Sequence, residues 1–141
     1  MKQILRICAG LAMLAALLAS CYSRRELAYY ADKENYIQAS GVVTHRMYSE
    51  DGTTLYLAFS DLDYNFDDNN FKIVGEGLQT AKSNGIDKKV EIGVTVSFMA
   101  APMYLGDGYV IPIASISIGE ETLLSFDDGF QSIQEWIKGT N

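Results

Sequence analysis

From residue 36 onward, apolar and polar positions alternate along much of the chain with the period of two that is typical of β-strands. The clearest run is Lys89 to Phe98, in which every second residue from Val90 onward is apolar. The other predicted strands are Tyr36–Tyr48, Thr53–Ser60, Phe71–Val74 and Tyr109–Ile118, followed by an apolar extension, Leu123–Phe126. The pattern therefore predicts at least five strands.

Two segments show helical spacing instead. Glu76 to Asn84 predicts a short helix that ends at Asn84-Gly85. Gly129 to Lys138 predicts a second helix, with Asp127 or Asp128 as its N-cap. Its apolar residues fall on one face: Phe130, Ile133, Trp136 and Ile137. We expect that face to pack on the sheet rather than on lipid.

Glycine and proline mark the breaks in this pattern. Gly41 lies inside the longest strand and predicts a bulge or sharp bend. Asp51-Gly52 is typical of a tight hairpin turn. The apolar positions of the fifth strand change face near Ser115, and Pro112 cannot donate a ladder hydrogen bond. A bulge or an edge position is therefore expected near Pro112.

The order of elements is three strands, a helix, two strands, an extension and a C-terminal helix. This order resembles the OB-fold, a small five-stranded, partly open barrel with a helix between strands 3 and 4. The resemblance covers Tyr36 to Ile118 and implies a mainly β (α+β) fold in one domain, residues 36–141. A sandwich and a lipocalin-like fold remain alternatives, although lipocalins need eight strands.

The first twenty residues have a different composition from the rest. Lys2 and Arg6 precede Ile7 to Ala19, an uninterrupted run of 13 small and apolar residues. Spanning a bilayer takes about 20 such residues. The segment is therefore predicted to be a secretory signal peptide over residues 1–20.

The end of that segment, Leu18-Ala19-Ser20-Cys21, resembles the lipobox of bacterial lipoproteins. The resemblance implies a diacylglyceryl (palmitate-type) anchor on Cys21 and a location on the extracytoplasmic face of a bacterial cell membrane. Tyr22 stands where an Asp would favour retention in the inner membrane. An ordinary signal peptide with a chance cysteine is the alternative. Residues 21–35 are then a lipidated tether with one helical turn, and the whole chain is similar to small bacterial OB-fold lipoproteins.

Charge and cysteine content narrow the possible functions. Without Lys2 and Arg6 the chain carries 9 basic and 18 acidic residues, a net charge of 9 − 18 = −9. Such a domain repels phosphate backbones, so no nucleic-acid partner is expected. Cys8 leaves with the signal peptide and Cys21 is lipidated, which leaves no thiol for a disulfide, a redox pair or a metal site. We expect no cofactor.

The segment Asp61–Asn70 gathers four carboxylates: Asp61, Asp63, Asp67 and Asp68. Counted as a calcium loop from Asp61, it has Phe66 where the turn needs Gly and Lys72 where the ion needs a bidentate Glu. We expect a polar connector between the second and third strands, in which Leu62, Tyr64 and Phe66 close the mouth of the barrel. An irregular cation site built from the four aspartates is the alternative.

Catalytic patterns are not found in the sequence. His45 is the only histidine, and the chain has no G-x-S-x-G elbow, no G-x-x-x-x-G-K-[ST] loop and no G-x-G-x-x-G loop. We assign no catalytic residue and expect no enzyme. The alternative is a metal-dependent hydrolase that uses the carboxylates of Asp61–Asp68.

Aromatic and methionine side chains instead indicate binding. In OB-folds, strands 2 and 3 and the loops between strands 1–2 and 4–5 form the usual ligand surface. The candidates on these elements are Tyr48, Tyr56, Met103, Tyr104 and Tyr109. Exposed groups of this kind suit a protein, a peptide or a sugar ring. The alternative, which the pattern favours for such residues in a small barrel, is that they cap the barrel core. The sequence thus predicts a membrane-anchored binding module, with a structural or assembly factor of a surface complex as a further alternative.

Overall fold

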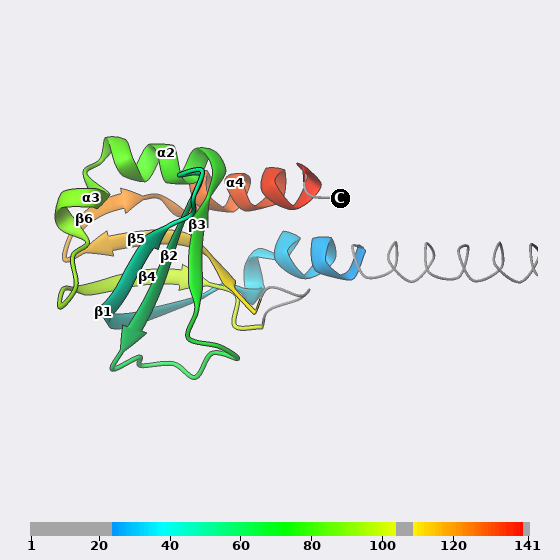
Figure 1. Ribbon diagram of the computed structural model, residues 1–141. Coiled ribbons are helices and arrows are strands. Elements are labelled where there is room, and N and C mark those ends of the chain that lie inside the picture. The colour runs from blue at the N-terminus through cyan, green and yellow to red at the C-terminus, as the bar shows by residue number, and fades with distance from the viewer. Residues whose placement is uncertain (1–23, 104–108, 140–141) are drawn as a thin grey trace, which may run out of the picture.

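The structure is a computed structural model that describes residues 24–103 and 109–139 of the 141-residue chain (Figure 1). It opens with an N-terminal helix over residues 24–31. The elements that follow are η1 (Lys33–Asn35), β1 (Ile37–Tyr48), β2 (Thr54–Ser60), β3 (Phe71–Val74), α2 (Gly75–Ser83), α3 (Ile86–Lys89), β4 (Thr95–Ala100), β5 (Ile111–Ile118), β6 (Glu121–Leu124) and α4 (Phe126–Gly139).

The strands form one six-stranded sheet in the order β3-β2-β1-β4-β5-β6. Neighbours in this order are antiparallel, and a further pairing joins β3 to β5 in parallel through Phe71 and Ile111. The predicted mainly β fold, with α2 between β3 and β4 and a C-terminal helix, is confirmed. The prediction of five strands is wrong by one, because the extension after β5 forms β6.

β1 is long because it pairs with two strands in succession. Its first half pairs with β4 and its second half with β2. The break that Gly41 predicts lies slightly further on, as an irregularity between Val43 and His45. Gly41 itself permits close packing, because a Cβ atom there would lie 2.9 Å from both Leu62 Cδ2 and Phe59 Cβ.

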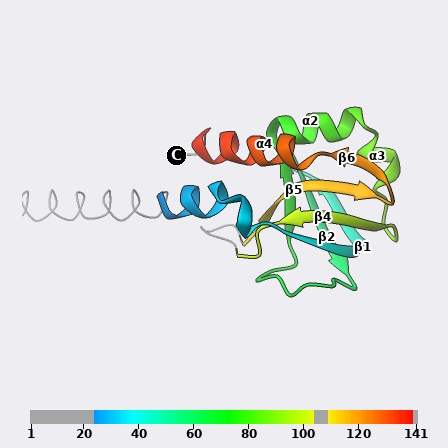
Figure 2. The same ribbon diagram turned by 180° about the vertical axis from the view of Figure 1, so that it is seen from behind.

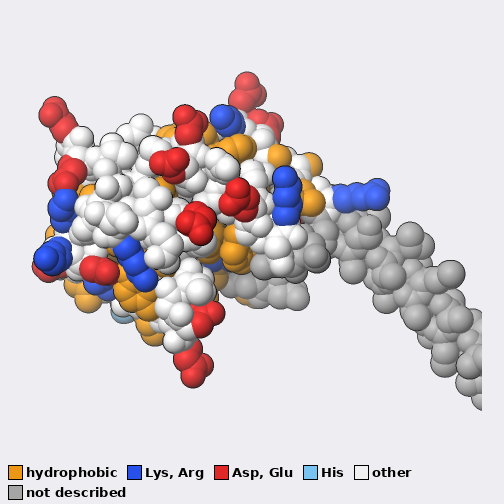
Figure 3. Space-filling model, turned by 90° about the horizontal axis from the view of Figure 1, so that it is seen from above, with side chains coloured by type: hydrophobic (Ala, Val, Ile, Leu, Met, Phe, Trp, Pro, Cys, Tyr) orange, Lys and Arg blue, Asp and Glu red, His pale blue; other side chains and the backbone are white. Residues whose placement is uncertain are grey.

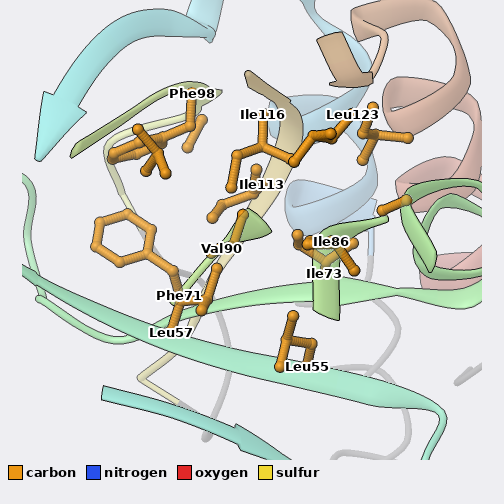
Figure 4. Packing of buried hydrophobic residues seen from close by; sticks show 14 of the residues in the cluster. Leu55, Leu57, Phe71, Ile73, Ile86, Val90, Phe98, Ile113, Ile116 and Leu123 are labelled. Carbon is orange, nitrogen blue, oxygen red and sulfur yellow. The ribbon is translucent and has the colours of Figure 1, made fainter. Parts of the chain in front are cut away.

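One face of the sheet covers the inner core, whose buried members among the described residues are all apolar. Four phenylalanines dominate one part of it, with ring centroids 4.8–5.7 Å apart: Phe59, Phe66, Phe71 and Phe98. Aliphatic residues from all six strands and from α2 and α3 fill the rest, and in Figure 4 Leu55, Ile113 and Ile86 point into the same interior as Phe71 and Phe98. Each fully buried side chain of this size stabilises the fold by about 1.5–3 kcal/mol.

A second group of buried residues, the outer cluster, lies on the other side of the sheet. It consists of Tyr30, Tyr36, Ala101, Ala114, Ile133 and Ile137, with Leu27, Tyr29, Met99, Phe126, Phe130 and Trp136 around them. These residues come from the N-terminal helix, β4–β5 and α4, and the two helices lie side by side in both views (Figures 1 and 2). The predicted packing of the C-terminal helix against the sheet is confirmed.

α4 approaches its neighbours closely enough to require small residues. A Cβ atom at Gly129 would lie 1.8 Å from the carbonyl oxygen of Ala114 on β5. Three residues later, the buried Ser132 hydroxyl donates to the Val74 carbonyl oxygen at 2.7 Å and accepts from the Gly77 amide at 2.9 Å. A side chain of α4 thus satisfies backbone groups at the start of α2, where the helix has no partner of its own.

The strand predicted over Lys89–Phe98 is wrong in its first half. Residues 86–89 are helical, and Ile92, expected on the apolar face, is 66% exposed. Gly93 has φ +93°, and its amide donates to the Val43 carbonyl at 2.7 Å. The chain therefore turns at Gly93, and only Thr95–Ala100 enters the sheet.

The other boundaries differ by smaller amounts. α4 begins at Phe126, earlier than predicted, and the Ser125 hydroxyl, rather than an aspartate, accepts from the Asp128 amide at 3.3 Å. The expected irregularity in β5 is confirmed in its pairing with β4, between Met99 and Ala100. It turns Ser115 and Ser117 away from the inner core.

Candidate functional site

The β4–β5 loop presents two of the five predicted ligand residues on the surface. Met103 is 47% exposed and Tyr109 is 57% exposed, among the largest exposed apolar side chains in the described residues. Tyr104, predicted with them, lies outside the described residues. Met103 follows β4 and Tyr109 precedes β5, and the pairing of Ala100 with Ile113 places these two strand ends side by side.

Three contacts brace the base of this loop. The Tyr30 hydroxyl donates to the Met103 carbonyl oxygen at 3.1 Å, and the Met103 amide donates to the Tyr29 hydroxyl at 3.0 Å. From the other side, the Asp67 amide donates to the Pro102 carbonyl at 3.1 Å. The N-terminal helix and the acidic segment therefore hold the Met103 side of the loop in place.

Tyr109 has an uncommon backbone conformation. Its φ is +48°, in the left-handed region, where a bulky side chain costs about 1–2 kcal/mol. Such strain persists only where the surroundings determine it, and it clusters at ligand-binding positions. The exposed Tyr109 ring thus stands on a strained backbone position next to β5.

Tyr48 lies far from this loop, at the other end of β1. Its register partner is Leu55, whereas the start of β1 pairs with Ala100 next to the loop. The Tyr48 hydroxyl donates to the Asp87 carboxylate of α3, and the Lys82 amine lies 4.7 Å from the ring centroid. Burial, followed by the hydrogen bond and charge of Asp87, raises the pKa of Tyr48 to about 12.

The same carboxylate also receives an arginine. Arg46 Nη2 lies 2.9 Å from Asp87 Oδ1, while Arg46 Nε is buried without a hydrogen-bond partner. The Tyr48 hydrogen bond, together with Arg46, lowers the pKa of the Asp87 carboxyl. Tyr48 thus fastens the end of β1 to α3 and is not free to face a ligand alongside Met103.

Tyr56 lies on the outer face of β2, half-buried between two cross-strand neighbours. These are Met47 on β1, which is 67% exposed, and Lys72 on β3. Side chains of a strand alternate between faces, so Tyr56 points away from the inner core that Leu55 and Leu57 enter. The structure therefore places the predicted residues in three separate regions.

Lys72 is the main charged group that sequence reasoning missed. Its amine lies 3.5 Å from the centroid of the Trp136 ring of α4. Burial lowers the pKa of Lys72 to about 8, and the charge of Glu26 on the N-terminal helix partly opposes this. Because Lys72 lies between Phe71 and Ile73 in a strand, the sequence predicts that its side chain points away from the core. The sequence does not predict that α4 covers it.

The acidic segment connects β2 and β3, as expected. The Asp63 carboxylate accepts from the Ser40 amide at 2.7 Å, and the Asn69 side chain bonds both backbone groups of Phe59. Phe66 enters the inner core, whereas Tyr64 stays 42% exposed. The segment encloses a surface hollow of about 450 Å³, lined by residues 62–69.

The four aspartates proposed for a cation lie around this hollow or beside it. Asp61, Asp63 and Asp67 are exposed and Asp68 is half-buried. In the part of the chain that the structure describes, no three His, Cys, Asp or Glu side chains gather as a group that could hold a metal ion. His45 is exposed on β1, where its Nδ1 lies 3.1 Å from the Thr44 hydroxyl.

The comparisons with known proteins add no family. No protein-family model matches the chain, and no curated protein matches it significantly. Within residues 24–103 and 109–139, none of the helices has the length and apolarity needed to cross a bilayer.

Proposed function

We propose that the chain is an extracytoplasmic bacterial lipoprotein, anchored through Cys21, whose domain binds a protein, peptide or glycan without catalysing a reaction. The anchor is inferred from the lipobox Leu18–Cys21 and the apolar run before it. The binding role rests mainly on one observation: Met103 and Tyr109 stand exposed, and the N-terminal helix bonds the backbone of Met103.

The proposed domain is an OB-fold-like barrel of five strands with β6 added at one edge. The pairings support a closed ring, because β1 pairs with β2, β2 with β3, β3 with β5, β5 with β4 and β4 with β1. The bend in β1 and the position of α2 between β3 and β4 support the same assignment. In such a barrel the β4–β5 loop belongs to the usual ligand surface.

The properties of this loop suit recognition. The hydrogen bonds at Pro102 and Met103 lower the entropy that binding costs there, and aromatic and methionine side chains are enriched in interfaces. Tyr109 offers a ring for stacking on a sugar or packing on a peptide, and Met103 offers an adaptable apolar contact. Tyr48 is assigned instead to the contact with α3.

The anchor is tested on the precursor. Cys21→Ala, or treatment with globomycin, should leave the signal peptide uncleaved or release the protein from the membrane. Mass spectrometry of the wild-type protein should find acyl chains on Cys21. An anchored mature form of the Cys21→Ala variant would contradict the lipidation.

The binding surface is tested with two matched variants. A photo-crosslinking amino acid is placed at Met103 in one variant and at Met47, which is equally apolar and more exposed, in the other. For a protein or peptide partner, we expect crosslinks from position 103 and none from position 47. For a glycan partner, we expect binding on a glycan array that Tyr109→Ala abolishes. Equal crosslinking at both positions would mean that the loop has no special role.

A further inference from the structure

The N-terminal helix is part of the folded domain, although its sequence predicts a tether. Tyr30 is only 2% exposed, and its carbonyl oxygen accepts from the Tyr36 hydroxyl at 2.8 Å and from Gln134 Nε2 at 2.7 Å. The Asn35 amide group donates to the Tyr29 carbonyl at 2.9 Å. The helix is thus attached to both η1 and α4 and has little freedom to swing away.

This attachment leaves very little chain between the proposed anchor and the domain. Only Tyr22 and Ser23 separate Cys21 from Arg24, the first described residue of the helix. An extended chain spans at most about 3.6 Å per residue, so three steps reach about 11 Å. A lipid on Cys21 would therefore hold the start of the N-terminal helix at the depth of the headgroups.

The short connection to Cys21 would place the start of the N-terminal helix at the membrane, and this end of the domain is basic. Arg24 and Arg25 are exposed at the start of the N-terminal helix, and Lys138 is exposed in the last turn of α4 beside it. Among the described residues, the acids at this end are Glu26 and Glu135; Glu26 is half-buried and its charge acts on Lys72, and the Glu135 carboxylate accepts from Gln131. Figure 3 shows Lys and Arg side chains near this end of the domain and others at the opposite end, where acidic side chains lie beside them.

We propose that this basic end lies against the headgroups of an anionic bilayer, so that Arg24, Arg25 and Lys138 orient the domain on the membrane. The proposal rests on lipidation of Cys21. Beyond residue 20 the chain has a net charge of −9, so an anionic surface repels most of the domain. The three basic residues are attracted to that surface, so the end that carries them faces it. α3 and the turn before β4 lie at the opposite end and point away from the membrane (Figure 1).

The test uses the lipidated protein in vesicles of phosphatidylcholine with or without phosphatidylglycerol, both containing brominated acyl chains. A fluorophore is attached at Gly139→Cys, where a new side chain meets open space, or at Ile92→Cys, which lies in the far turn. The mature chain has no other unmodified thiol if Cys21 is lipidated. We expect strong quenching at position 139 and none at position 92, with more quenching when phosphatidylglycerol is present.

Two triple variants separate charge from anchoring. Replacing Arg24, Arg25 and Lys138 by Gln should reduce quenching at position 139 to its level in neutral vesicles. Replacing Lys33, Lys82 and Lys88 by Gln removes the same charge elsewhere and should leave it unchanged. Because the screening length falls to about 3 Å in 1 M salt, high salt should act on the wild type as the first variant does.

The outcomes distinguish this proposal from the proposed function. Acylated protein with equal quenching at both positions, or with no response to the first triple variant, would overturn the orientation and leave the lipoprotein assignment intact. A chain without acyl groups on Cys21 would overturn both.

Discussion

The inner core and the outer cluster are both buried, but they hold the chain by different means. The buried members of the inner core, among the described residues, are all apolar and come mostly from strands that pair with one another. The outer cluster contains tyrosines whose hydroxyls bond to backbone groups, and it joins two helices to the sheet. One region therefore buries the inner face of the sheet, and the other attaches the N-terminal helix and α4 to the sheet.

This difference has a thermodynamic consequence. When an apolar core side chain is shortened, the free energy of unfolding falls roughly in proportion to the volume of the cavity that is left. A cluster built on hydrogen bonds and close helix contacts is instead sensitive to single atoms at particular points. Four substitutions test the contrast, from the largest expected effect to the smallest.

Phe71→Ala should destabilise the protein most, by about 4 kcal/mol, because it empties the centre of the inner core. Phe71 is fully buried and its ring contacts those of Phe59, Phe66 and Phe98. Urea unfolding measured by circular dichroism gives the free energy of unfolding. Tyr64→Ala, at a 42% exposed ring, is the control and should change it by less than about 1 kcal/mol. Similar losses in both variants would contradict an enclosed inner core.

Gly129→Ala should cost about 3 kcal/mol, since one methyl group would collide with the Ala114 carbonyl and push α4 off the sheet. Gly139→Ala adds the same group to the same helix, where nothing lies within 4 Å, and should be close to neutral. Thermal unfolding compares the two variants. A neutral Gly129→Ala would mean that α4 does not sit on β5 as described.

Ser132→Ala should cost about 2 kcal/mol, because it leaves the Val74 carbonyl and the Gly77 amide buried without their partner. Ser83→Ala removes an exposed hydroxyl that bonds only within its own helix, and it should have little effect. Hydrogen exchange adds a local measurement: amides of the first turn of α2 should exchange faster in Ser132→Ala only. Unchanged exchange there would show that Ser132 of α4 does not bond the start of α2.

Lys72→Met should stabilise the protein by about 1 kcal/mol at pH 7, because it removes a half-buried charge whose desolvation is only partly offset by Trp136. The folded-state pKa is about 8 against an ordinary 10.5, so from pH 8 upward the unfolded chain binds more protons than the folded one. Wild-type stability should therefore rise with pH above 8.

Urea unfolding at pH 7 to 9.5 measures this slope, and Lys72→Met should lack it. Lys88→Met, at an exposed position on α3, is the control and should keep the wild-type slope. Equal slopes in wild type and Lys72→Met would show that the amine is not desolvated beneath Trp136.

The sequence predicts the parts of this fold that depend on local pattern. β2 alternates strictly between buried and half-buried residues, and its prediction is correct to within one residue. The hairpin turn is confirmed at Gly52, whose φ is +73° and whose amide donates to the Ser49 carbonyl at 2.9 Å. In these segments each residue's environment follows from its neighbours in the chain.

The failures occur where distant segments decide the conformation. Val90 to Val94 alternates like a strand, but hydrogen bonds between Val43 and residues 93 and 94 make the chain turn there. The same holds at the candidate site. Tyr29 and Tyr30 meet Met103 across more than 70 positions, and Lys72 meets Trp136 from a different element. The periodicity of the sequence does not encode such contacts. The sequence therefore predicted the exposed loop residues, but not the hydrogen bonds that Tyr29 and Tyr30 make to Met103.

The pairing of β3 with β5 also determines the order in which the chain is expected to fold. Phe71 and Ile111 are 111 − 71 = 40 positions apart, whereas β1 and β2 are joined by a short turn. A hairpin of that kind forms in about 1–10 μs, while closing a long segment costs chain entropy before any contact repays it. The parallel pairing of β3 with β5 (the parallel seam) should therefore form after the main barrier to folding. Substitutions at that seam should then mainly accelerate unfolding and leave the folding rate nearly unchanged.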